Sequence, residues 1–155
     1  MKKLLQLLLC SFILAGCIGE NYDVGHPITF IENGGKTFEL TPSYVAWSSK
    51  SDNTNYDKRQ TELEMQEIIV HQGEYVNLLF RDRTDKGGEY GESSIKVYSN
   101  HNNNETLLYE TAIISPYLEE LHSFTVPEEV GEYTLTVEFS TGNDYAEYVG
   151  KLIVQ

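Results

Sequence analysis

Four acidic side chains in one glycine-rich segment are the first residues whose spacing could support chemistry. Asp82, Asp85, Glu89 and Glu92 fall within residues 82–92. Calcium takes six to eight oxygen ligands, often from acids clustered on a bent loop. The spacing D-x-x-D-x-x-x-E-x-x-E matches no calcium loop pattern, so solvated surface acids are the main interpretation. Weak calcium binding is the alternative, and we expect no other metal or cofactor.

The four histidines have no partner at the spacing of a metal site such as H-x-x-x-H or H-E-x-x-H. His26, His71 and His101 fall in predicted turns, where we expect surface positions. His122 starts a predicted strand close to Glu119 and Glu120, where a zinc site is a remote alternative. No G-x-S-x-G motif occurs, and paired acids on a strand point to opposite faces. The sequence therefore predicts no enzyme.

The N-terminus carries a targeting pattern. Lys2 and Lys3 precede an apolar run from Leu4 to Leu14. As a helix this run would span about 17 Å, whereas a bilayer core is about 30 Å thick. The run is therefore too short for a transmembrane helix and is typical of a secretory signal.

The residues LAGC, Leu14 to Cys17, resemble the lipobox of bacterial lipoproteins. The resemblance implies that Leu14, Ala15 and Gly16 are recognised by the signal peptidase. It also implies that Cys17 carries a covalent diacylglyceryl lipid and becomes the first residue after removal of 1–16. The chain would then be anchored to the cell membrane, outside the cytoplasm, or to the outer membrane if the host has one. Small lipoproteins of bacilli show a weaker likeness, and an ordinary cleaved signal with a chance cysteine is the alternative.

Charge and cysteine content limit the possible partners. The net charge is −13, and removal of the two lysines in 1–16 makes it about −15. Such a chain should be repelled by nucleic acid. The two cysteines are Cys10, in the removed segment, and Cys17, so no disulfide is expected. The remaining 139 residues (155 minus 16) predict one domain over 28–155, preceded by a short tether at 17–27.

Short segments with period-two alternation recur along the chain and are separated by turn residues. This pattern predicts an all-β, antiparallel β-sandwich. Residues 61–70 fit either a helical turn or a strand, and residues 48–60 and 81–93 are predicted polar loops. The predicted strands are 28–31, 37–40, 43–47, 74–80, 94–99, 106–110, 122–126, 131–139 and 145–154.

The stretch FTVPEEVGEYTLTVEF, Phe124 to Phe139, resembles the end of bacterial immunoglobulin-like and fibronectin-III-like domains. The likeness extends more loosely over 67–155. In such folds a tyrosine fills a corner between the sheets, and its hydroxyl bonds to nearby backbone. The resemblance assigns this place to Tyr133 and implies an Ig-like sandwich, but no activity.

Five aromatic residues fall in or beside predicted loops and could form a recognition patch, although core packing is the main interpretation. We expect a lipid-anchored binding or adaptor lipoprotein whose partners are the membrane, through its anchor, and an unspecified envelope protein or surface ligand. An inhibitor or immunity-type protein acting through an exposed loop is the alternative. A cation- or solute-binding protein is the third. The aromatic residues are Tyr44, Trp47, Tyr56, Tyr90 and Tyr117.

Overall fold

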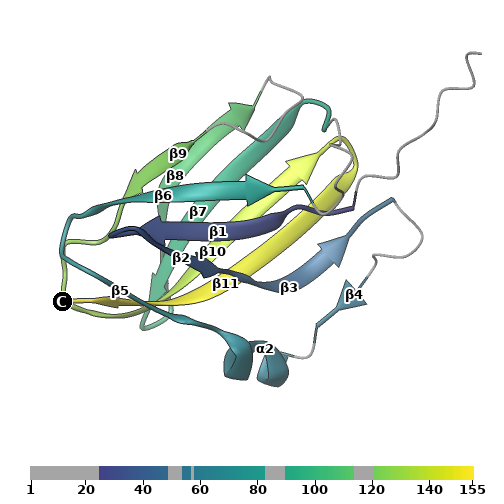
Figure 1. Ribbon diagram of the computed structural model, residues 1–155. Coiled ribbons are helices and arrows are strands. Elements are labelled where there is room, and N and C mark those ends of the chain that lie inside the picture. Colours follow the sequence, from purple (N-terminus) through teal and green to yellow (C-terminus); the bar gives the residue numbers. More distant parts are fainter. Residues whose placement is uncertain (1–24, 49–53, 57, 83–89, 114–120) are drawn as a thin grey trace, which may run out of the picture.

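The computed structural model describes residues 25–48, 54–56, 58–82, 90–113 and 121–155. Two β-sheets pack face to face (Figure 1). The predicted lipobox at Leu14 to Cys17 lies outside the described residues. Within the described part of the chain, no helix is long and apolar enough to cross a membrane.

The small sheet contains four strands and the large sheet seven. The order in the small sheet is β2 (Lys36–Glu39), β1 (Ile28–Asn33), β6 (Tyr75–Arg81) and β9 (His122–Thr125). The order in the large sheet is β4 (Thr54–Asn55), β3 (Thr41–Ala46), β11 (Asp144–Val154), β10 (Gly131–Thr141), β7 (Ser93–His101) and β8 (Asn104–Ile113), with β5 (Glu67–Val70) also paired to β11.

The predicted all-β sandwich is confirmed, and its strands follow from alternation. Along β10 the side chains of Leu135, Val137 and Phe139 are fully buried, while Thr134 is exposed. Because successive side chains of a strand point to opposite faces, one face of each sheet reaches a shared core. Buried residues from both sheets form a single hydrophobic cluster.

Tight turns fix the register of the long hairpins. Asn102 and Asn103 connect β7 to β8 with positive φ angles of 52° and 65°. Two-residue hairpin turns require this left-handed backbone, which asparagine tolerates. The resulting hairpin pairs His101 with Asn104, as the predicted asparagine turn requires.

Two features add to the predicted antiparallel sandwich. The helix α2 (Lys58–Glu64) begins within the predicted polar loop 48–60 and continues into the segment 61–70, where a helical turn was one of the two predicted alternatives. Strand β5 follows it and runs parallel to β11, the one parallel pairing among the described strands. The helix is held by its neighbours, since the Thr41 hydroxyl donates to the Glu64 carbonyl at 3.3 Å. Tertiary contacts of this kind stabilise a short helix that its own sequence does not.

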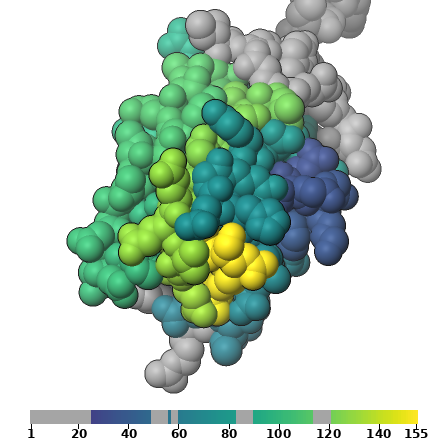
Figure 2. All heavy atoms as spheres, turned by 90° about the vertical axis from the view of Figure 1, so that its left-hand side faces the viewer, coloured from purple at the N-terminus to yellow at the C-terminus, as the bar shows by residue number. Residues whose placement is uncertain are grey.

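Tyr133, the predicted corner residue, lies at the end of the sandwich where β10 begins. The Tyr133 hydroxyl donates to the Glu129 carbonyl at 2.8 Å, and burial raises the pKa of Tyr133. Figure 2 shows this end, where the turn after β5 lies beside the C-terminus and the segment after β9. Backbone hydrogen bonds from Gln72 to Gln155 and from Gly73 to Pro127, both at 3.3 Å, join these segments.

Candidate binding groove

The predicted acidic cluster is only partly described. Asp85 and Glu89 lie outside the described residues, and Glu92 is exposed. Across the described ranges, no three histidine, cysteine, aspartate or glutamate side chains gather where they could hold a metal ion.

Two of the four histidines are buried rather than at the surface. His26 was expected in an exposed turn, yet it is 2% exposed. Its Nδ1 lies 3.1 Å from the Tyr148 hydroxyl, and its ring meets Trp47 edge-on. His122 is also buried, with Nδ1 at 3.2 Å from the Tyr109 hydroxyl. Both side chains take part in packing, and the chain belongs to the fold already before Ile28, within the predicted tether.

The aromatic residues separate into core and surface positions. Trp47 and Tyr90 are buried and meet Phe139 in the core. Tyr44 is 42% exposed and lies 5.9 Å from Tyr145, ring centroid to centroid. Tyr117 falls outside the described residues. Core packing is therefore the role of Trp47 and Tyr90, and Tyr44 remains available at the surface.

A hollow of about 780 Å³ lies over the outer face of the large sheet, and we call it the outer groove. Its floor is formed by outward side chains of β10 and β11. Helix α2 and the segments beside it form one wall, and the turn between β7 and β8 contributes to the opposite end. The lining residues are Ser43, Tyr56, Thr61, Glu62, Met65, Asn100, Asn102, Asn103, Glu132, Tyr133, Thr134, Thr136, Glu147, Val149 and Lys151.

Ser43 enters the outer groove because of a β-bulge. Tyr44 pairs with Glu147, but Pro42 pairs with the next residue, Tyr148, so Ser43 is the extra residue on β3. A bulge re-aims the side chain of its unpaired residue. The Ser43 hydroxyl lies within hydrogen-bond distance of the Glu147 carboxylate and at 3.3 Å from the Glu147 carbonyl.

Glu147 lies directly opposite another carboxylate on the outer face. Glu138 of β10 is its cross-strand partner, and like charges in this position destabilise a sheet. Hydroxyl groups reduce the repulsion, since Tyr145 also donates to Glu147 at 3.4 Å. Burial, and then the charges of Glu138 and Glu147, raise the pKa of Tyr145, so its hydroxyl stays protonated.

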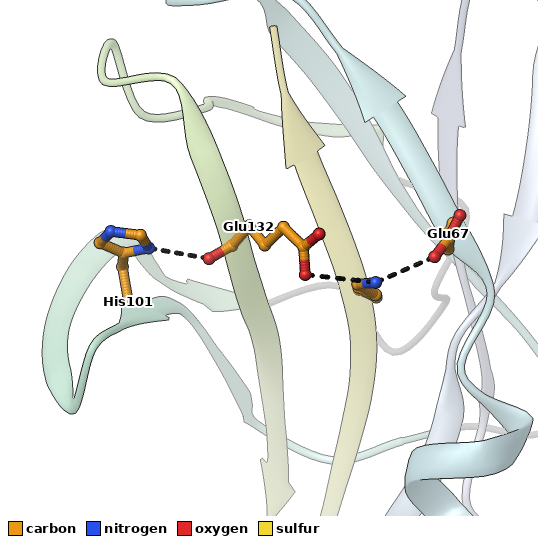
Figure 3. A network of polar contacts seen from close by, with 4 residues as sticks. Glu67, His101 and Glu132 are labelled. Atoms are coloured by element: carbon orange, nitrogen blue, oxygen red, sulfur yellow. Dashed lines mark hydrogen bonds and ion pairs between the residues drawn. The ribbon is translucent and has the colours of Figure 1, made fainter.

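The positive charge of Lys151 is held by two glutamates. Its ammonium lies 2.9 Å from the Glu67 carboxylate and 3.3 Å from that of Glu132. These hydrogen bonds, to Glu67 first, raise the pKa of Lys151. Figure 3 shows Glu67, Glu132 and His101 on neighbouring elements, with His101 Nδ1 at 2.8 Å from the Glu132 carbonyl. The contacts fix this end of the groove.

No family model and no curated protein matches the chain. A CBM33 protein of Bacillus amyloliquefaciens in complex with Cu(I) aligns with a TM-score of 0.48 and 10% identity, over 58% of this chain and 56% of that one. The catalytic domain of an LPMO from Listeria monocytogenes aligns at 0.44 and 9%, over 58% and 60%. A chitin binding domain from Burkholderia pseudomallei aligns at 0.45 and 9%, over 94% and 93%.

This chain thus spans little more than half of the first two neighbours. Those neighbours also correct two expectations from the sequence. A domain named as catalytic and a domain holding Cu(I) are among the structures to which this sandwich is similar. The prediction that such a sandwich carries no enzyme and no cofactor is therefore wrong. At this identity the similarity concerns the arrangement of strands and assigns no role to any residue here.

The sequence contained one signal for the outer groove. The outward positions of β10, Thr134 and Thr136, are polar but uncharged, and the alternation of a strand predicts that they lie on the face away from the core. The walls were missed because they come from distant segments. The start of the helix that borders the groove was predicted as loop, and the rest was left open between a helical turn and a strand. The bulge at Ser43 leaves no pattern in the sequence.

Proposed function

We propose that this chain is a lipid-anchored extracytoplasmic binding module, and that the outer groove is its ligand-binding site. The observation that supports it most directly is the groove itself. A hollow of about 780 Å³ lies over a sheet face whose other side is the core. Binding sites are typically concave, with a few polar groups that orient the ligand.

The anchor in this proposal is Cys17, preceded by the recognition residues Leu14, Ala15 and Gly16. A single acyl chain binds a membrane marginally, whereas two chains give a stable anchor. The diacylglyceryl group would therefore hold the domain at the membrane while leaving the sheets free. Nucleic acid is not a suitable ligand, because the chain has a net charge of −13.

The anchor is tested by intact mass and membrane fractionation of the wild type and Cys17→Ala. We expect a diacylglyceryl mass on a chain that begins at Cys17, and release or retained precursor in the variant. An unmodified Cys17 on a chain that is free in solution would contradict the anchor.

The binding site is tested with variants that each carry one introduced cysteine. The chain's own cysteines, Cys10 and Cys17, lie in the removed segment and at the lipidated position in this proposal. Thr134→Cys places a thiol in the outer groove, and Thr125→Cys places one on the exposed face of the small sheet. Both should react with a membrane-impermeant maleimide on intact cells. The maleimide should modify Thr134→Cys more slowly on cells than in the purified protein. It should modify Thr125→Cys at the same rate in both. Equal rates at both positions on cells and in the purified protein would show that nothing occupies the groove.

A further inference from the structure

We propose that the ligand of the outer groove is an extended, uncharged carbohydrate chain. This inference rests on the proposed binding function and names the class of its ligand. It is carried by the chemistry of the groove lining, by the pairing of its charges and by its length across the sheet.

The lining is dominated by hydroxyl and amide groups. Seven of the fifteen lining residues are serine, threonine or asparagine: Ser43, Thr61, Asn100, Asn102, Asn103, Thr134 and Thr136. A hydroxyl both donates and accepts a hydrogen bond, and an amide side chain offers two donors and an acceptor. Sugar hydroxyls have the same dual character. Such a lining can therefore satisfy a chain of sugar hydroxyls without any charge on the ligand.

Three of the four charged groups in the lining, Lys151, Glu132 and Glu147, already have partners. Lys151 forms ion pairs with Glu67 and Glu132, so two carboxylates already balance its positive charge. Glu147 has hydroxyl neighbours in Ser43 and Tyr145. Three glutamates and one lysine in the lining would repel anionic ligands. A carboxylate that already accepts hydrogen bonds from hydroxyl groups can accept another from a sugar.

Aromatic rings lie at the β3 side of the groove. Tyr56 is part of the lining, and Tyr44 is exposed beside Glu147 in the sheet register. Tyr44 and Tyr145 form a tilted pair. A tyrosine ring presents an apolar face together with a polar hydroxyl, and a sugar ring has the same combination of apolar C–H groups and hydroxyls.

The groove extends across four strands of the large sheet. Its lining includes residues of β7, β10, β11 and β3, which are consecutive neighbours in the large sheet. Three strand spacings of about 4.8 Å give a length of about 14 Å. A site of this length suits several units of a polymer better than a single small molecule.

The ligand class is tested by calorimetric titration of the full chain in a zwitterionic, sugar-free detergent. The neutral probes are cellohexaose, chitohexaose and maltohexaose, and the charged probes are hexalysine and hexaglutamate. At least one neutral hexasaccharide should bind with a Kd of about 1 mM or lower. Its affinity should change less than about twofold between ~0.05 M and ~0.5 M NaCl, because no charges are screened. Hexaglutamate should not bind.

Matched variants place the binding in the groove. Thr134→Trp fills the floor and should weaken binding by at least about tenfold, whereas Thr125→Trp, an exposed strand position on the other sheet, should bind like the wild type. Aromatic residues are favoured in strands, and equal unfolding midpoints of the two variants would exclude misfolding. If Thr134→Trp unfolds, Tyr44→Ala replaces it, with an expected loss of about fivefold.

The outcomes separate the two proposals. Binding of hexalysine alone, with strong salt dependence, would replace carbohydrate by a cationic peptide and leave the binding module in place. A chain that is protected at Thr134 on cells but binds none of the three hexasaccharides would overturn the carbohydrate inference alone. Hexasaccharide binding that is equal in both tryptophan variants would place the ligand outside the groove.

Discussion

The two faces of the large sheet contrast sharply although they share the same backbone. On β10 the inward residues Leu135, Val137 and Phe139 are fully buried. The outward residues Thr134 and Thr136 line the outer groove. The inner face stabilises the fold through apolar burial, whereas the outer face presents hydrogen-bonding groups to solvent. The alternation of side chains along a strand thus places the residues that stabilise the fold on one face and the residues that line the groove on the other.

The difference arises from what covers each face. The small sheet lies along the inner face, so that side chains of both sheets interdigitate. The described elements that flank the outer groove include α2 and the turn between β7 and β8. The inner face is covered by the small sheet and forms a core, whereas the outer face is covered only in part and forms a groove. Changes on the inner face should therefore alter stability, and changes on the outer face should alter binding.

The largest expected effect comes from Phe139→Ala. The Phe139 ring is fully buried and packs against Phe80 and Tyr90. Large-to-small changes of this kind cost about 3–5 kcal/mol. Urea unfolding should show this loss, whereas the outward change Thr136→Ala should cost about 0.5 kcal/mol or less. Equal losses for the two variants would contradict the division between the faces.

A smaller loss is expected from Gly150→Ala, which adds one carbon to the inner face. The new Cβ would lie 2.7 Å from Cδ2 of Leu40 and 3.4 Å from Cδ1 of Ile68. Overpacking of this kind costs about 1–3 kcal/mol. Adding Leu40→Val should recover part of the lost stability in the same unfolding measurement. An additive double variant would show that Leu40 is not the group that is displaced.

Alkaline pH should weaken the fold through Tyr145 on the outer face. Burial, and then the carboxylates of Glu138 and Glu147, raise its pKa in the folded state. In the unfolded chain the pKa is about 10, so above that pH the unfolded state loses its proton first and stability falls. The free energy of unfolding should decline above pH ~10, and Tyr145→Phe should make the decline shallower. An unchanged slope in the variant would contradict this role.

The smallest expected effect is that of Lys151→Met. The Lys151 ammonium is solvent-accessible and bridges two carboxylates on the outer face. Exposed ion pairs contribute little to stability, and salt screens them. The loss in unfolding free energy should therefore be largest at low salt and vanish in ~1 M NaCl. A loss that persists at high salt would mean that the packing of the lysine stem dominates.

Much of the fold was predictable because alternation is a local property. The inward face of β10 and the turn at Asn102 and Asn103 follow directly from neighbouring residues. The burial of His26 depends on Tyr148 and Trp47, far away in the sequence. Helix α2 likewise depends on a contact with Thr41.

The outer groove could not be predicted for the same reason. The floor of the groove follows from the alternation of the strands, but one of its walls is helix α2. Ser43 reaches the groove only through a bulge. Local sequence patterns therefore predict which residues face outward, but they do not predict that the outer face of the large sheet is concave. Core packing, the main interpretation of the loop aromatics, is confirmed for Trp47 and Tyr90, because both rings are buried.

The most direct test of the contrast between the sheet faces is photocrosslinking on intact cells. A benzophenone amino acid would replace Thr134 in the outer groove or Thr125 on the small sheet, one at a time. The account predicts a discrete adduct, seen as a mass shift of the purified chain, from position 134 and none from position 125. Adducts from position 125 alone, or equally from both positions, would contradict the assignment of ligand binding to the outer groove.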